Sequence, residues 1–278
     1  MTTTLAKSEK TKTRRWTLEE AMAALRKMGT AQNVKVYKRH GAGENLFGVS
    51  FANLTVLKKQ LGVDHDLALA LWDTGNSDAR TLGTMIADPS ALAPDATERW
   101  VNETRYYLLS DLLSGLVARS RFAREKMEEW MRSEREFVKQ CGYDVLGGLL
   151  RDGAEITDSE CSKILGRIEK EIHGSPNRAR HAMNMALIGI GIYRPALEAR
   201  AIAAARRIGK VEVDHGETGC KTPDAASYIP KARAYFAARA AKAGAGKAKP
   251  AAGKGPTTAL KAAALAARPA RKKAGAAK

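Results

Sequence analysis

Residues 47–89 read FGVSFANLTVLKKQLGVDHDLALALWDTGNSDARTLGTMIADP, and this stretch decides the fold class. Ser50 stands where a helix N-cap is expected, apolar residues follow at helical spacing, and Gly62 ends the pattern. A second helix is predicted over residues 66–72, and a third over residues 77–87, just before Asp-Pro. Short helices separated by turns of Gly, Asn and Asp predict a helical array.

The same pattern continues along the chain in both directions from this stretch. Helices of about 10 to 15 residues are predicted, joined by short turns that carry Gly, Asn, Asp or Pro. The further predicted helices span residues 17–29, 95–118, 122–132, 134–151, 157–173, 177–191 and 195–209. No segment shows the period-2 alternation of a strand. Paired helices recurring about every 40 residues predict an all-α fold, a HEAT-like solenoid built as a curved stack of antiparallel helix pairs.

Four regions are predicted from composition. Residues 1–15 form a flexible basic arm, 16–209 the HEAT-like domain, 210–240 a loop and short helix that cap it, and 241–278 a disordered Lys/Ala-rich tail. The tail carries +10 and the arm +4, which leaves about +3 of the total charge of +17 for the folded part. Much of the expected attraction to a polyphosphate backbone therefore comes from the two ends of the chain.

The sequence also indicates where the protein is located in the cell and which redox state its cysteines have. No apolar run approaches the roughly 18 residues of a membrane span, and the first residues lack the apolar core of a secretory signal. Three cysteines without a C-x-x-C pair predict reduced thiols rather than a disulfide framework. We therefore expect a cytoplasmic protein, associated with the nucleoid, without a membrane contact.

One stretch near the middle of the array, residues 97–111 (TERWVNETRYYLLSD), combines aromatic side chains with a carboxylate. Asp111 follows Tyr107 by four residues, so the two side chains share one face of a helix. A carboxylate beside an aromatic face can stabilise a sugar cation. It can equally be a solvated Asp next to core aromatics, and the residues alone leave both interpretations open.

The motifs in residues 47–89 resemble the DNA alkylation repair proteins built of HEAT-like repeats, the AlkD-type DNA glycosylase superfamily. The resemblance rests on the Gly-Val-Ser opening, the Leu-Trp-Asp-Thr-Gly turn, the Asp-Ala-Arg helix start and the closing Ala-Asp-Pro, and it extends to about Arg194. It implies a helical-repeat fold and a DNA-binding protein similar to enzymes that hydrolyse the N-glycosidic bond of cationic N3- or N7-alkylpurines. The implied partner is double-stranded, alkylated DNA, bound by a monomer without a cofactor or a metal ion.

The resemblance also implies roles for individual residues. After the Trp-Val pair, Tyr107 takes the place of the family's aromatic and Asp111 that of its catalytic carboxylate, while Leu108 replaces an intervening Asp. A Trp-x-x-Arg helix start aligns with FVKQ, so that Phe137 replaces Trp and Gln140 replaces the DNA-contacting Arg. Expected DNA contacts are thus Tyr107, Lys139, Gln140, Arg178, Arg180 and Met185, the last at the position of a second aromatic.

Two further features allow more than one interpretation. Arg178, Arg180 and His181 open a predicted helix, where the dipole favours phosphate, but they also fit a solvated face. The loop around Asp214 and Cys220 holds metal-ligating residue types, although its spacing matches no zinc motif and favours a structured turn. For the whole protein, the alternatives to a glycosylase are a non-catalytic DNA-binding relative and a HEAT-like protein scaffold.

Overall fold

The computed structural model describes residues 15–217 and 219–244, and most of this part is helical. Its secondary structure is α-helix and 3₁₀-helix apart from a single β-bridge between Gly29 and Val49, as the all-α prediction requires. The predictions for the basic arm and for most of the tail fall outside the described residues. No helix in the described part is long and apolar enough to cross a membrane.

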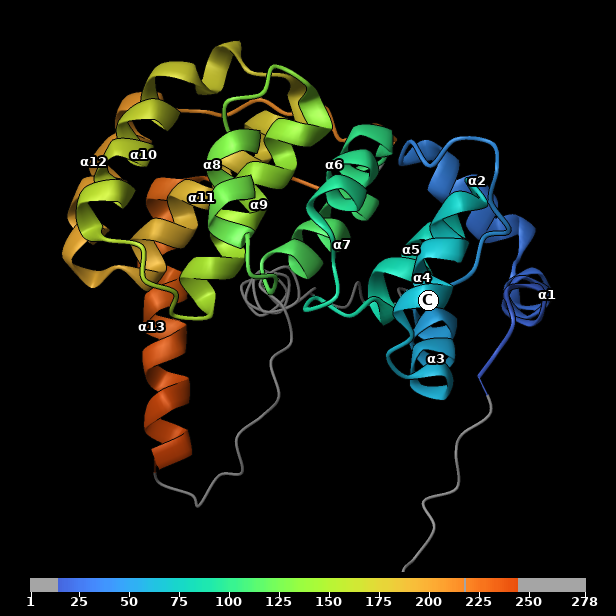
Figure 1. Ribbon diagram of the computed structural model, residues 1–278. Helices are drawn as coiled ribbons and strands as arrows, with labels where there is room; N and C mark the ends of the chain where they lie inside the picture. Colours follow the sequence, from blue (N-terminus) through green and yellow to red (C-terminus); the bar gives the residue numbers. More distant parts are fainter. Residues whose placement is uncertain (1–14, 218, 245–278) are drawn as a thin grey trace, which may run out of the picture. The chain divides into compact units, whose positions relative to one another are not determined.

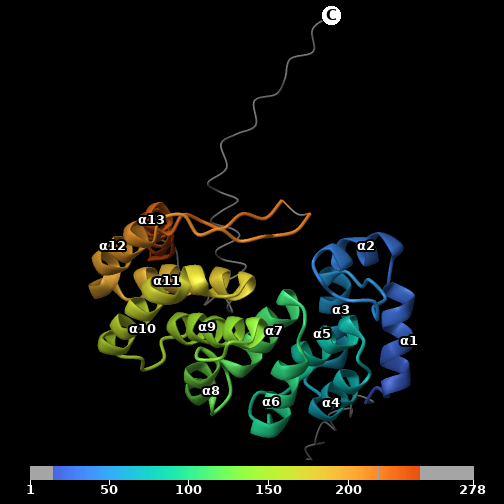
Figure 2. The same cartoon turned by 90° about the horizontal axis from the view of Figure 1, so that it is seen from above.

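The chain divides into two compact units, which Figures 1 and 2 show from two directions. Of the described residues, unit 1 comprises 15–35 and 45–88, and unit 2 comprises 36–44, 89–217 and 219–244. The helices of unit 1 are α1 (Leu18–Met28), the first part of α2 (Ala31–Arg39), α3 (Phe51–Leu61), α4 (His65–Asp73) and α5 (Ser77–Ile86).

Helices α1, α3, α4 and α5 begin within one residue of their predicted starts. Thr17 and Glu20 form a capping box at α1, and Ser50 accepts a hydrogen bond from the Asn53 backbone N–H at the start of α3. The helix α2 was not predicted, since its sequence AQNVKVYKR is largely polar, and none of its residues is buried.

The side chain of Asp78, at the start of α5, organises the loop that leads into α3. Its Oδ2 accepts hydrogen bonds from the backbone N–H groups of Phe47 (2.6 Å) and Gly48 (2.9 Å), and its Oδ1 accepts one from Val49 (2.9 Å). Gly48 has φ +77°, and a Cβ there would lie 2.7 Å from the backbone nitrogen of Val34. The Gly-Val-Ser and Asp-Ala-Arg motifs are therefore two halves of one structural contact.

Unit 2 contains the helices that hold the candidate site. These are α6 (Pro94–Glu103), α7 (Tyr107–Val117), α8 (Ala123–Trp130), α9 (Glu136–Arg151), α10 (Asp158–Glu171), α11 (Asn177–Tyr193), α12 (Glu198–Ile208) and α13 (Ala225–Gly244), with 3₁₀ turns at Ile172–Gly174 and Pro195–Leu197. Each even-numbered helix packs on the next odd-numbered one, which gives four consecutive helix pairs. The second helices of the pairs, α7, α9, α11 and α13, pack in turn on one another and form one row (Figure 2).

The prediction of one helix over residues 95–118 was wrong, because the chain breaks between α6 and α7. Thr104 leaves the helical conformation with ψ 128°, and its hydroxyl donates to the carbonyl of Trp100 at 2.9 Å. Arg105 Nη1 donates to the carbonyls of Asn102 (2.5 Å) and Thr104 (3.0 Å). These side chains satisfy carbonyls that a continuing helix would have paired, so Tyr107 becomes the first residue of a new helix. At the other end of the unit, the predicted short helix is α13, 20 residues long with Pro230 inside it.

Candidate functional site

Three neighbouring helices of the odd-numbered row bring five polar side chains together. Tyr107 and Asp111 come from α7, Gln140 and Asp144 from α9, and Arg178 from the first turn of α11. Tyr107 and Asp111 are four residues apart on α7, and besides burial the charge of Asp111 raises the pKa of Tyr107, so the two side chains lie near one another. Gln140 Nε2 lies 3.3 Å from the Tyr107 backbone carbonyl oxygen and 2.9 Å from Asp111 Oδ1. Asp144 was missed in the sequence, although its spacing of four from Gln140 places both on one helix face.

Asp111 and Asp144 form a carboxyl pair that Gln140 bridges. Gln140 Nε2 donates to Asp111 Oδ1 at 2.9 Å and to Asp144 Oδ2 at 3.2 Å. Burial raises the pKa of Asp144 well above its usual value, and the neighbouring Asp111 raises it further, through its charge and a hydrogen bond to it. Two carboxyl groups this close disfavour a second negative charge, so the pair holds a proton at pH values where an exposed Asp is ionised.

Replacing Asp144 by asparagine should remove a pH dependence from the stability of the protein. A folded-state pKa above the unfolded value means that the folded protein binds one proton more than the unfolded chain between those two pKa values. The contribution of Asp144 to the free energy of unfolding is therefore fully present below the unfolded-state pKa. It is lost as the pH rises through the folded-state pKa, with a slope of up to about 1.4 kcal/mol per pH unit. Asp144→Asn should flatten this fall and be more stable than the wild type at pH 8.

The measurement is the free energy of unfolding in urea between pH 5 and pH 8. Asp66→Asn is the control, because the Asp66 side chain is 86% exposed and lies in unit 1. Equal slopes for Asp144→Asn and the wild type would show that Asp144 does not carry the proton.

The aromatic face of Tyr107 is covered by a cation from the protein itself. The guanidinium carbon of Arg178 lies 3.8 Å from the centre of the Tyr107 ring, a cation–π contact. The Tyr107 hydroxyl lies 2.6 Å from His40 Nδ1, and burial together with nearby Cys220 and Asp111 raises the pKa of Tyr107 to about 12, against a lowering by Arg178. The resemblance implied that Tyr107 contacts DNA, but in this structure Arg178 covers the face of its ring.

The N-terminus of α11 is likewise occupied from within. Glu136 Oε1 accepts a hydrogen bond from the backbone N–H of Arg178 at 2.6 Å, so a carboxylate of α9 sits where the sequence predicted phosphate. Arg180 is partly exposed and donates from Nε to the Ser175 carbonyl at 3.2 Å. Met185 is partly exposed and lies on the same helix face as Arg178, seven residues earlier.

Lys139 and Gln140 do not present their side chains to an outside phosphate. Lys139 is 4% exposed and its ammonium lies 3.5 Å from Glu134 Oε1, while Gln140 is 2% exposed and binds the two carboxyl groups. Helix α9 packs on α6, α7, α8 and α11, so nearly every side of it is covered. The DNA contacts that the resemblance implied for these two residues would require them to move, whereas Arg180 needs no such change.

The loop after Gly209 packs on the start of α11 and supports Arg178. His215 Nδ1 lies 3.4 Å from Arg178 Nη1, and its Nε2 lies 2.9 Å from Thr222 Oγ1. Burial and the charge of Arg178 lower the pKa of His215, which favours a neutral ring that accepts from the guanidinium. Asn177 exchanges two hydrogen bonds of 2.7 Å with the backbone of Asp214. The loop is thus a structured turn, and within the described residues no group of three His, Cys, Asp or Glu side chains is placed to hold a metal ion.

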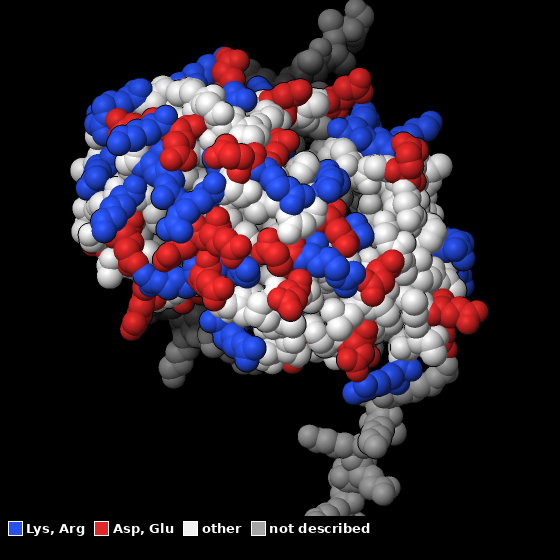
Figure 3. Space-filling model, turned by 45° about the horizontal axis from the view of Figure 1, so that its top comes forward, with Lys and Arg blue, Asp and Glu red and all other residues white. Residues whose placement is uncertain are grey.

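The charged surface is mixed rather than uniformly basic. Figure 3 shows Lys and Arg side chains interspersed with Asp and Glu over the face that it presents. This agrees with the small net charge that the sequence leaves for the folded part.

Comparison with known proteins connects this arrangement with a family. The family model described as DNA alkylation repair enzyme matches residues 21–229. The uncharacterized protein Lin0241 of Listeria innocua serovar 6a is 30% identical over 222 residues, which cover 77% of this chain and 96% of the relative. The uncharacterized protein Lmo0209 of Listeria monocytogenes serovar 1/2a is 29% identical with the same coverage.

A solved structure gives the same result for the fold. It is described as a new family of proteins related to the HEAT-like repeat DNA glycosylases, with affinity for branched DNA structures. It matches with a TM-score of 0.72 and 28% identity, covering 79% of this chain and 94% of the other. The predicted HEAT-like repeat fold is confirmed by this match.

Proposed function

Because the chain belongs to the DNA alkylation repair enzyme family, we propose that it is a DNA-binding repair protein that contacts branched or distorted duplex DNA through the row of α7, α9 and α11. The observation that carries this proposal is the convergence of Tyr107, Asp111, Asp144 and Arg178 on that row. The relative with solved structure has affinity for branched DNA, and its likeness covers most of this chain.

The self-occupied site favours recognition of DNA structure over recognition of a cationic base. Arg178 already covers the face of the Tyr107 ring. Glu136 already caps the N-terminus of α11, where a phosphate would otherwise bind. A cationic base would have to displace a guanidinium that is held by both the ring and His215. Binding at the rim of this site, through Arg180 and Met185, needs no such displacement.

The proposal predicts a measurable role for Arg180. Arg180→Ala should weaken binding of the full chain to a four-way DNA junction about fivefold and should lower the slope of log affinity against log salt by about one, because one phosphate contact is lost. Fluorescence anisotropy at several salt concentrations measures both quantities. Arg206→Ala is the matched control, since Arg206 is an exposed Arg on α12, outside the odd-numbered row.

Two results would count against the proposed function. One is the absence of a preference of the wild type for the junction over a linear duplex of equal length. The other is an equal loss of affinity in Arg180→Ala and Arg206→Ala, which would mean that charge alone, and not the row of α7, α9 and α11, governs binding.

Excision of alkylated bases is a second candidate function, favoured by the partly exposed carboxyl of Asp111 at the family's catalytic position. An ionised Asp111 would stabilise positive charge on the deoxyribose as the N-glycosidic bond breaks, with water supplying the hydroxyl of the product sugar. This candidate expects release of 7-methylguanine from alkylated duplex, reduced at least about a hundredfold in Asp111→Asn. No release by a wild type that binds junctions would leave the binding function and exclude excision of this base.

A further inference from the structure

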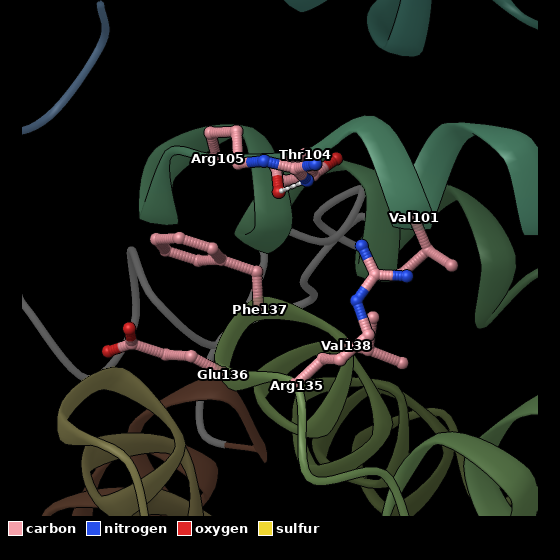
Figure 4. Close-up of a pocket in the computed structure, with 7 residues that line it drawn as sticks. All are labelled: Val101, Thr104, Arg105, Arg135, Glu136, Phe137 and Val138. Carbon is pink, nitrogen blue, oxygen red and sulfur yellow. Dashed lines mark hydrogen bonds between the residues drawn. The ribbon is translucent and has the colours of Figure 1, made fainter.

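A pocket of about 290 Å³ opens between the end of α6 and the start of α9 (Figure 4). Its lining residues are Val101, Thr104, Arg105, Arg135, Glu136, Phe137 and Val138. All of them belong to unit 2. The volume is close to the lower end of the roughly 300–1,000 Å³ range of small-molecule sites, which suits a planar group of modest size.

One side of the pocket is aromatic and apolar. Phe137 is partly exposed and lines the pocket together with Val101 and Val138, which are buried. In the view of Figure 4, the Phe137 ring lies between the side chains of Arg105 and Glu136. Since Arg178 covers the Tyr107 ring, Phe137 is the aromatic of this region that lines an open space into which a base could stack.

The other side of the pocket carries two Arg side chains, while Glu136, the acidic residue of the lining, accepts a hydrogen bond from the Arg178 backbone N–H. Arg105 donates to the carbonyls of Asn102 and Thr104, and Arg135 binds the side-chain oxygen of Asn102 and donates to its carbonyl at 2.9 Å. These acceptors are neutral, so they fix both guanidinium groups without cancelling their charge. Arg135 is also the N-cap residue of α9 and makes no side-chain cap, so the positive end of this 16-residue helix adds to the same side.

We propose that this pocket binds an unpaired nucleotide of DNA, with the base stacked on Phe137 and its phosphate between Arg105 and Arg135. An aromatic platform next to a guanidinium pair suits one nucleotide at a time, because every base has a π-face and every nucleotide carries one phosphate. The inference rests on the proposed DNA-binding function and specifies it, because branch points and distorted duplexes supply unpaired nucleotides.

The test uses a duplex with one unpaired 2-aminopurine and the same duplex fully paired. The full chain should bind the unpaired probe more tightly and quench its fluorescence by stacking. Phe137→Leu should lower affinity for the unpaired probe about tenfold and abolish the quenching, with the paired duplex unaffected, and Phe137→Trp should restore both. Arg135→Ala should lower the affinity for the unpaired probe about fivefold. At saturating protein concentration, the fluorescence of the stacked 2-aminopurine should still be quenched.

Controls separate this inference from the function on which it rests. Phe51→Leu, at a 41% exposed Phe of α3 in unit 1, should change neither affinity nor quenching. Retained junction binding with equal quenching by Phe137→Leu and the wild type would overturn the pocket assignment alone. If the wild type binds neither the junction nor the duplexes, the proposed function itself is wrong.

Discussion

Gly142→Ala should lower the free energy of unfolding by about 3 kcal/mol, although Gly→Ala in a helix normally raises it. Helix α9 crosses the end of α8 at Gly142, and a Cβ there would lie 2.7 Å from the carbonyl carbon of Trp130 and 3.0 Å from the Met131 Cα. These are backbone atoms, which cannot rotate away as a side chain can. The whole of α8 would have to shift, and α9 carries Gln140 and Asp144.

Gly147→Ala is the control for this prediction. Gly147 lies on the same helix, five residues later, and nothing lies within 4 Å of the position of its Cβ. This substitution should therefore stabilise the protein by up to about 1 kcal/mol. Urea unfolding followed by circular dichroism measures both variants, and a Gly142→Ala protein as stable as Gly147→Ala would disprove the close contact of α8 and α9.

Asp78→Ala should destabilise unit 1 by about 3 kcal/mol or more. The substitution removes the acceptor of three backbone N–H groups at 2.6 to 2.9 Å, and Asp78 is only 3% exposed. Each buried donor that loses its partner costs about 1 to 3 kcal/mol, and hydrogen bonds to a charged acceptor are at the upper end of the usual range. Water that reaches the loop can accept a hydrogen bond from a freed N–H group and so lowers this cost.

Two further variants identify the cause of this loss. Asp78→Asn keeps one acceptor oxygen and turns an amide N–H₂ toward a backbone donor, so we expect most of the loss to remain. Asp66→Ala removes an exposed carboxylate of the same unit, 3.7 Å from Arg15, and should cost less than about 1 kcal/mol. Equal effects of Asp78→Ala and Asp66→Ala in the unfolding measurement would contradict the role of the three hydrogen bonds.

The helices of this protein could be predicted because their signals are local. Thr17 with Glu20, Ser50, Asn76 and Thr157 each accept a hydrogen bond within the first turn of the helix that they begin, as their sequence positions indicated. The errors occur where side-chain contacts interrupt a helical pattern, or where a helix forms without a buried face. Thr104 and Arg105 end α6 inside an otherwise continuous helical sequence, and α2 forms without any buried side chain.

The candidate site was predictable only in part. Tyr107 and Asp111 lie on one face of α7 because they are four residues apart, and this spacing can be read from the sequence. Lys139 was expected on the surface from its charge, but α9 packs against helices on nearly every side and buries it. Asp144 joins Asp111 only because α7 and α9 are neighbours, so neither the carboxyl pair nor its shared proton could be inferred from the spacing of residues 33 apart.

The all-α helical-repeat fold and the membership of a DNA repair family could be recognised from the amino-acid sequence, since caps, periodicity and motifs are properties of short segments. What occupies the site became visible only with the packing of the helices. Arg178 reaches the Tyr107 ring across 71 residues of sequence and Glu136 reaches α11 across 42. Long-range contacts of this kind depend on the packing of whole helices, and no local pattern encodes which side chain fills the space between them.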